Sequence, residues 1–296
     1  MKIIVLGAGA IGSFYGAKLS KLNNTLLIAK KEHADKINKN GLKVTGLENR
    51  EYRLKAAVKI EKIKEDTLIL LTTKVYDSKN AISSIKNLLK KDTIILCLQN
   101  GLYSENIVRE IVGKKCLVLR AITNVGAAFL SAGIVQYNNR SYTIIEKSPI
   151  SKNLAKNFSE CGLNGSVSEN IKFDMWKKLI LNCVLNPLTT ILRVENRNIA
   201  DEKLNPLKKL IVEECSKVAE KDGIKFNVEF VKKINDGLKD SRNISSMLQD
   251  LMKGKKTEID YLNGAVVKLG KKYGVKCPVN EALVKIIKEM EKEVIS

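Results

Sequence analysis

With 296 residues, the chain is long enough for roughly two domains and for a large core that needs no disulfides. Its 44% hydrophobic content excludes a disordered chain, and the sequence has no apolar run of about 18 residues that would indicate a transmembrane helix. The formal net charge of +20 favours acidic partners, but the lysines are spread along the chain and only 5% of the residues are aromatic, so we expect no nucleic-acid partner.

The first half of the chain alternates short apolar runs with amphipathic stretches. The apolar runs predict strands at 2–6, 25–29, 67–72, 93–98 and 116–122. Helical periodicity between them, as at 11–21 and 77–90, favours a parallel sheet with helices on both faces. Two later runs, 133–137 and 142–146, flank the sequence NNRS and predict an antiparallel hairpin or a sheet edge.

The first predicted strand is followed at once by a glycine motif, GxGxxG, which opens a predicted helix. In this context the motif is typical of dinucleotide-binding folds. Gly7 would allow the tight turn, Gly9 would let the backbone approach a pyrophosphate, and Gly12 would let the helix pack on the strand. The segment predicted to bind the cofactor consists of Gly7, Ala8, Gly9, Ala10, Ile11 and Gly12.

The end of the second predicted strand indicates which dinucleotide is bound. NAD-binding enzymes place an acidic residue there to hold the ribose 2′-hydroxyl, whereas this chain has Lys30 and Lys31. Two ammonium groups suit a 2′-phosphate, so we expect NADPH, although Glu32 follows directly. The sequence leaves open which lysine contacts the phosphate and how strict the preference over NADH is.

From about residue 168 onward, strand signals nearly vanish and helical periodicity dominates. Helices are predicted at 171–192, 205–221, 228–238, 259–273 and 280–294. We therefore expect an α/β fold with a Rossmann-like dinucleotide-binding domain at 1–167. An all-helical domain for substrate binding and catalysis is expected at 168–296.

The first of these predicted helices is apolar nearly all round, which indicates that it is buried. Lys178, Asn182 and Asn186 are spaced by four residues and share one face, whereas Lys177 points about 100° away. Buried amides and a buried lysine need polar partners, so this stripe predicts either a cavity for a small oxygen-rich ligand or hydrogen bonds to neighbouring helices. Pro187 also frees the backbone carbonyl one turn earlier.

The residue inventory restricts the chemistry that the chain can perform. A single histidine, His33, argues against His-based triads and His-rich metal sites. The six cysteines form no CxxC pair, so we expect reduced buried thiols and no bound metal. Acid–base work then falls to Lys, Glu, Asp, Tyr or Cys. Hydroxyls at 245–246 and the carboxylate of Glu258 are expected either to cap helix starts or to serve a site.

Taken together, these motifs resemble the ketopantoate reductase (2-dehydropantoate 2-reductase) family over nearly the whole chain. The matching segments, in order, are GAGAIG at 7–12, TTK at 72–74, QNG at 99–101, WKKLILNCVLNPLTT at 176–190, SSMLQD at 245–250 and TEIDYLNG at 257–264. The resemblance implies reduction of 2-dehydropantoate to (R)-pantoate with NADPH, on the route to pantothenate and coenzyme A.

The resemblance also implies roles for single residues. Lys178 corresponds to the general acid that protonates the nascent alkoxide, and Glu258 to its catalytic partner. The residues expected to bind the substrate are Asn100, Asn182, Asn186 and Ser246. Besides the glycine segment and the two strand-end lysines, those expected near the cofactor are Lys74, Asn100 and Glu258.

Two other functions remain open from the sequence. Another hydroxyacid dehydrogenase of similar architecture would also use a catalytic lysine, and a cofactor-sensing or nucleic-acid-binding protein would carry these residues without turnover. The first residues resemble a strand and a turn rather than a signal peptide, so we expect a cytoplasmic enzyme with a small-molecule substrate and no membrane partner. Dimers are common in the resembling family, and the sequence leaves a homodimer open.

Overall fold

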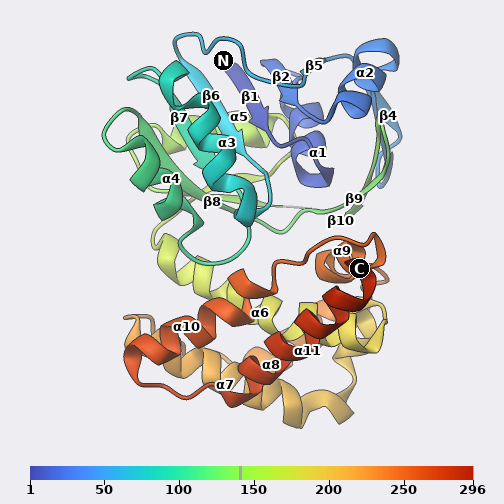
Figure 1. Cartoon of the computed structure of the whole chain (residues 1–296), viewed down its shortest axis with the longest axis vertical. Helices are drawn as coiled ribbons and strands as arrows, with labels where there is room; N and C mark the ends of the chain where they lie inside the picture. Colours follow the sequence, from blue (N-terminus) through green and yellow to red (C-terminus); the bar gives the residue numbers. More distant parts are fainter. Residues whose placement is uncertain (140–141, 296) are drawn as a thin grey trace. The chain divides into compact units, whose positions relative to one another are not determined.

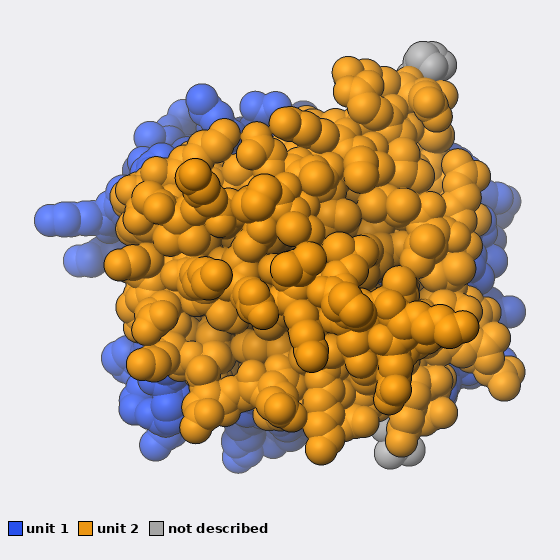
Figure 2. Space-filling model, turned by 90° about the horizontal axis from the view of Figure 1, so that it is seen from below, with its two compact units in different colours: residues 1–99, 103–171 blue, residues 100–102, 172–296 orange. Residues whose placement is uncertain are grey.

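The computed structural model describes residues 1–139 and 142–295. The chain divides into two compact units, which Figure 2 colours blue and orange. The first unit comprises Met1–Gln99 and Tyr103–Ile171, and the second comprises Asn100–Leu102 and the chain from Lys172 onward. This division lies slightly later than the one expected at 167/168, and it also transfers Asn100–Leu102 to the second unit.

The first unit is built on an eight-stranded sheet (Figure 1) with the strand order β12-β11-β8-β7-β6-β1-β2-β5. All neighbouring pairs are parallel except β11 with β8. Because β1 lies between β2 and β6, the loop after β1 opens at the point where the strand order reverses, which is where open α/β sheets bind ligands. The predicted Rossmann-like fold is confirmed. The strands are β1 (Lys2–Leu6), β2 (Asn24–Ile28), β5 (Lys55–Ala57), β6 (Thr67–Leu71), β7 (Ile94–Cys97), β8 (Leu117–Thr123), β11 (Thr143–Glu146) and β12 (Gly165–Ser168).

Side chains of the main sheet are buried on both faces. Along β1, Ile3 and Val5 belong to one core cluster, with residues of α1 and α5, and Ile4 and Leu6 belong to another, with residues of α3 and α4. Burial on both faces explains why the strands are continuous apolar runs in the sequence. The helices of this unit are α1 (Ala10–Leu19), α2 (Lys31–Asn40), α3 (Ser78–Ile85), α4 (Ser104–Val112) and α5 (Ser151–Glu160), with 3-10 turns η1 (Val75–Asp77) and η2 (Lys86–Leu88).

A second, four-stranded sheet in the same unit has the order β4-β3-β10-β9. Its strands are β3 (Leu42–Gly46), β4 (Arg50–Tyr52), β9 (Gly126–Ser131) and β10 (Ile134–Asn139). The hairpin or sheet edge predicted from 133–137 and 142–146 is therefore wrong, because β10 lies between β3 and β9 whereas β11 lies between β12 and β8. Apolar alternation identifies a strand but not its partner. The last two residues of NNRS, 140 and 141, lie outside the described residues.

The second unit is helical, as its periodicity predicts. Its helices are α6 (Ile171–Leu192), α7 (Asn205–Lys221), α8 (Phe230–Leu238), α9 (Ser246–Met252), α10 (Asn263–Tyr273) and α11 (Pro278–Ile295), with 3-10 turns η3 (Asn196–Ala200), η4 (Glu202–Leu204) and η5 (Ile259–Tyr261). The helix predicted at 259–273 is thus divided into η5 and α10. Within 1–139 and 142–295, no helix has both the length and the apolar character needed to cross a membrane.

The start of α6 is fixed to its neighbours through one buried carboxylate, Asp222. Asp222 accepts hydrogen bonds from Trp176 Nε1 at 2.8 Å and from Tyr273 OH at 2.7 Å. Lys172 Nζ lies 3.2 Å from the same carboxylate. Since these partners come from α6 and α10 and Asp222 follows α7, the contacts hold the helix that carries Lys178 in a defined position.

Candidate active site

The glycine motif forms the turn between β1 and α1. Gly7 has a φ of +106°, and a Cβ added there would lie 2.6 Å from Thr73 N. A Cβ added at Gly12 would lie 2.3 Å from Gly7 O, so the packing of the unit itself requires both glycines. At Gly9, which is exposed, an added Cβ would meet no atom within 4 Å. The space beside Gly9 is open, as close approach of a pyrophosphate to the backbone requires.

The TTK segment lies directly beside this turn. Thr72 Oγ1 donates a hydrogen bond to Gly7 O at 2.9 Å. Gln99 Nε2 donates to Thr73 O at 2.9 Å and to Ser78 Oγ at 2.6 Å. The backbone that presents the half-buried Lys74 is therefore fixed next to the glycine turn.

Lys30 and Lys31 lie at the start of α2, just beyond the end of β2. Both are exposed, and Lys30 is the residue that precedes the first turn of the helix. The end of β2 is tied to the glycine turn, because Ala8 N donates to Ile28 O at 2.8 Å. Two ammonium groups and a helix N-terminus thus follow the strand end that adjoins the glycine turn, an arrangement that favours an anion.

His33, the single histidine of the chain, supports the glycine turn through Ser13. Its Nδ1 accepts a hydrogen bond from Gly133 N at 2.8 Å, which leaves the proton on Nε2, 2.9 Å from Ser13 Oγ. Ser13 Oγ in turn donates to Ala8 O at 3.2 Å. Only the neutral imidazole can make this set of bonds, and burial lowers the pKa of His33 below its ordinary value of 6.5.

The lowered pKa of His33 predicts a loss of stability in acid. Because the unfolded chain binds the proton more readily, the contribution of His33 is present above pH 6.5 and is lost as the pH falls below that value. We expect the unfolding free energy of the protein, measured in urea, to fall more steeply between pH 7.5 and 5.5 than that of His33→Gln. Parallel pH curves for the two proteins would contradict this prediction.

In the second unit, the side chain of Asn100 bridges Lys178 and Glu258. Lys178 Nζ donates to Asn100 Oδ1 at 2.8 Å, and Asn100 Nδ2 donates to Glu258 Oε2 at 3.3 Å. Glu258 is buried, whereas Lys178 and Asn100 are half-buried. The structure thus brings together three of the residues named from the sequence. An ammonium held in this way can hydrogen-bond an oxygen atom and transfer a proton to it.

The QNG turn that carries Asn100 is fixed on both sides. Gly101 has a φ of +81°, and a Cβ there would lie 2.5 Å from Tyr261 O, so only glycine lets this turn pack against the TEIDY segment. On the other side, the guanidinium of the buried Arg120 donates to the backbone oxygen of Gln99. These contacts restrict the position of the Asn100 amide.

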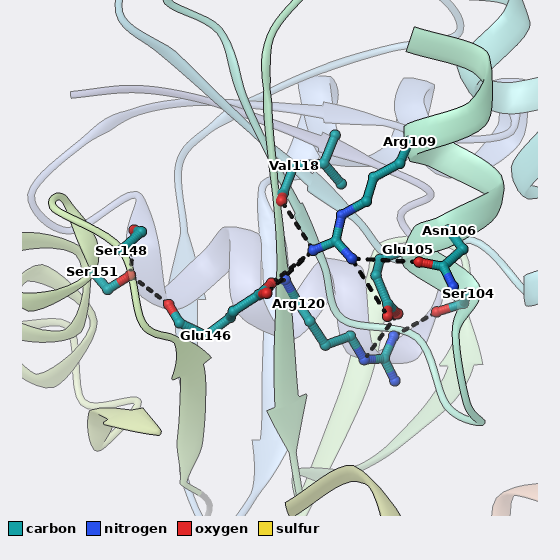
Figure 3. Close-up of polar contacts among 9 residues, drawn as sticks. All are labelled: Ser104, Glu105, Asn106, Arg109, Val118, Arg120, Glu146, Ser148 and Ser151. Carbon is teal, nitrogen blue, oxygen red and sulfur yellow. Dashed lines mark hydrogen bonds and ion pairs between the residues drawn. The ribbon is translucent and has the colours of Figure 1, made fainter. Parts of the chain in front are cut away.

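Arg120 belongs to a polar network of the first unit that the sequence analysis did not identify (Figure 3). Its guanidinium donates to Ser104 Oγ, and its Nε lies 3.8 Å from Glu105 Oε2. Its backbone N–H donates to Glu146 Oε2 at 2.7 Å, and that carboxylate also pairs with Arg109 at 3.0 Å. The network couples β8, α4 and β11 to the residue that precedes Asn100.

Asn182 and Asn186 follow Lys178 along α6 at the predicted spacing. Asn182 is half-buried, and Asn186 is only 4% exposed. Lys177 is exposed, in agreement with its predicted direction off the stripe. Lys178, Asn182 and Asn186 are therefore one ammonium and two amides spaced along one face of α6.

The two serines at the start of α9, Ser245 and Ser246, differ in burial and in their contacts. Ser245 caps the helix, since its Oγ accepts from Leu248 N at 3.2 Å, and it also accepts from Thr189 Oγ1 at 2.7 Å. Ser245 is buried, whereas Ser246, the predicted substrate ligand, is exposed on the first turn. The capping role expected for these hydroxyls thus belongs to Ser245.

Asn196 is a further candidate for binding a ligand, and it was not predicted from the sequence. Its N–H donates to Asn243 O at 2.8 Å, and its Nδ2 lies 3.4 Å from Ser241 Oγ. Its buried Oδ1 has no hydrogen-bond partner among the described residues, which is unusual unless a ligand or water supplies one. In the sequence, ENRN carries no periodicity or motif that would single out this amide.

Comparison with known proteins identifies relatives along the whole chain. The family described as ketopantoate reductase PanE/ApbA matches residues 3–149, and its C-terminal counterpart matches residues 170–291. A Pyrococcus horikoshii protein named 2-dehydropantoate 2-reductase is 37% identical over 299 residues, and one of the same name from Archaeoglobus fulgidus is 30% identical over 300 residues. Each alignment covers 98% of both chains.

Two solved structures are similar over the full length as well. The PanE/ApbA family ketopantoate reductase from Ralstonia eutropha JMP134 has a TM-score of 0.92 at 29% identity, with 100% of both chains covered. A D-mandelate dehydrogenase, in a ternary structure with NADH and anilino(oxo)acetate, has a TM-score of 0.93 at 32% identity, with 99% of both chains covered.

Proposed function

We propose that this chain, which belongs to the ketopantoate reductase family of oxidoreductases, reduces 2-dehydropantoate to (R)-pantoate with NADPH. The observation that carries the proposal is the hydrogen-bonded chain from Lys178 through Asn100 to Glu258. Reduction of a ketone places negative charge on its oxygen, and a held ammonium is the group that this charge requires. The product of this reaction lies on the route to pantothenate and coenzyme A.

In the proposed mechanism, Lys178 holds the ketone oxygen and delivers a proton to it, while bound NADPH supplies the hydride. Asn100 accepts one N–H of the ammonium and so directs the remaining donors of Lys178. Glu258 accepts from the other end of the Asn100 amide and thereby fixes its orientation. We therefore expect loss of the Glu258 carboxylate to slow the reaction less than loss of Lys178, the proton donor itself.

Substrate binding is assigned to three further polar residues of the second unit, Asn182, Asn186 and Ser246. A 2-keto acid with a hydroxyl group presents several acceptors, and the amides of Asn182 and Asn186 on the Lys178 face can donate to them. Ser246 adds an exposed hydroxyl at the first turn of α9. Small polar side chains at fixed positions are the groups that orient such a ligand.

Cofactor binding is assigned mainly to the first unit. The turn from Gly7 to Gly12 offers backbone N–H groups at the start of α1 and open space beside Gly9, which fits a pyrophosphate. Lys74 is proposed to lie near the phosphates. Asn100 and Glu258 are also proposed to contact the cofactor.

NADPH preference is proposed to depend on Lys30 and Lys31. Replacing both with alanine should weaken NADPH far more than NADH, by roughly tenfold or more, since a charged hydrogen bond contributes about 1.5–3 kcal/mol. Fluorescence titration of both cofactors measures this, and Lys271→Ala with Lys272→Ala, which removes the same charge from exposed positions of α10, is the control. Equal weakening of NADPH and NADH would contradict the assignment.

The activity itself is tested by following NADPH oxidation with 2-dehydropantoate as substrate and identifying (R)-pantoate as the product. We expect multiple turnovers per enzyme molecule. A folded, NADPH-binding protein that shows no turnover would instead support a cofactor-sensing role.

A second candidate is reduction of other 2-keto acids, since the D-mandelate dehydrogenase that binds NADH is 32% identical with a TM-score of 0.93. A panel that includes the keto acid of mandelate, assayed with both cofactors, separates the two activities. A higher kcat/KM for the aromatic keto acid with NADH would favour this second candidate. The pair Lys30–Lys31 argues for the first.

A further inference from the structure

The helix that carries the proposed catalytic lysine has a gap in its backbone hydrogen bonding. Pro187 lies inside α6 and lacks the N–H that would bond to the carbonyl of Cys183, four residues earlier. Both residues are buried, so water does not readily satisfy this carbonyl. An unsatisfied buried carbonyl is costly, and the gap would leave the two parts of the helix free to change their angle.

The side chain of Asn263 fills this gap. Its Nδ2 donates to Cys183 O at 2.9 Å, from the first residue of α10. Asn263 is fully buried. The amide thus supplies, from a different helix, the donor that proline removes.

Asn263 is itself held by a chain of buried polar groups. Its Nδ2 also donates to Asn280 Oδ1 at 2.9 Å, and Asn280 Nδ2 donates to Glu214 Oε2 at 2.7 Å. Glu214 further accepts the backbone N–H groups of Val279 and Asn280 at the start of α11, each at 2.9 Å. Because the Nδ2 group of Asn280 donates to Glu214, its Oδ1 is the atom that faces Asn263. The Nδ2 group of Asn263 must therefore face Asn280, and the same group donates to Cys183 O.

We propose that Asn263 is a positioning residue that sets the geometry of the active-site helix at Pro187. Lys178 and Asn182 lie before the gap, and Asn186 lies beside it, so the angle at the gap determines how Asn186 is placed relative to Lys178. The inference rests on the proposed function, since it assigns Asn186 to substrate. It adds the relay Glu214–Asn280–Asn263 as the structure that keeps the polar face of α6 aligned.

The test is a rescue experiment with two substitutions. Asn263→Ala should lower kcat/KM for 2-dehydropantoate by roughly 10- to 100-fold, mainly through KM, because a small misplacement of a substrate-binding group has effects of this size. Pro187→Ala returns a backbone N–H to position 187, which can bond to Cys183 O. The double variant should therefore recover to within about threefold of Pro187→Ala alone.

Asn235→Ala is the matched control. Asn235 is an amide of the same unit that bonds to Lys208 and Asn205 and makes no bond to α6. Its loss should lower the melting temperature but leave KM near the wild-type value, and Pro187→Ala should not rescue it. NADPH affinity should stay unchanged in all these variants.

The outcomes distinguish this inference from the proposed function. An unchanged KM in Asn263→Ala, or a double variant whose defects simply add, would overturn the positioning role. If the wild-type protein does not reduce 2-dehydropantoate, the proposed function fails, but coupling between the two substitutions in thermal unfolding still tests the relay. Additive melting temperatures would then overturn it, and a melting temperature restored by Pro187→Ala would support it.

Discussion

Replacing Lys178 with alanine is expected to slow hydride transfer to 2-dehydropantoate by about 10²–10⁴-fold, the usual contribution of a positioned general acid. The ammonium bonded to Asn100 is the donor that would be lost. NADPH affinity should remain near the wild-type value, because the glycine turn and the two strand-end lysines belong to the first unit and Lys178 to the second. Single-turnover kinetics and a cofactor titration measure the two quantities separately.

The control for Lys178 is its neighbour. Lys177 is exposed, so Lys177→Ala removes the same charge from the same helix without touching the Asn100 amide, and its effect should be mild. A small primary amine added to Lys178→Ala should restore part of the rate by replacing the missing proton donor. If Lys177→Ala lost activity while Lys178→Ala kept it, the proposed mechanism would be wrong.

The parts of the fold that the sequence predicts well are those determined by local pattern. The bounds of α6 and α7 follow from long periodicity, and α7 has proline near its start and Asp222-Gly223 after its end, which are ordinary helix boundaries. The glycine motif predicts the turn after β1 because a side chain at Gly7 or at Gly12 would clash with the neighbouring backbone. The stripe of Lys178, Asn182 and Asn186 likewise follows from helical spacing alone.

The parts that the sequence does not predict depend on contacts between distant residues. Nothing in QNG indicates that Asn100 joins the second unit, since that depends on the packing of Gly101 against the carbonyl of Tyr261. Among the strands that were not predicted, β4 and β5 are each three residues long, too short for a periodic signal. Arg120 and Glu105 are charged and would ordinarily be exposed, and their burial arises only because the fold brings them together.

Replacing Arg120 with alanine is expected to lower the free energy of unfolding by about 3–5 kcal/mol, the usual effect of removing one partner of a buried ion pair. Arg120 is 3% exposed and Glu105 is 4% exposed, so the substitution leaves a buried carboxylate without its buried cation. Arg109, with Nη1 at 3.9 Å from Glu105, has a side chain that is 41% exposed and compensates only in part. Urea unfolding followed by circular dichroism measures the loss.

A double variant separates the effect of charge burial from the anchoring of Gln99 O by Arg120. Arg120→Met combined with Glu105→Met replaces both members of the buried ion pair with uncharged side chains. Most of the stability lost in Arg120→Ala should therefore return. The double variant still lacks the guanidinium that bonds to Gln99 O, next to Asn100, so its kcat/KM should stay below the wild-type value. A double variant as unstable as Arg120→Ala would contradict the ion-pair argument. Full activity in a stable double variant would show that Arg120 stabilises the fold without positioning Asn100.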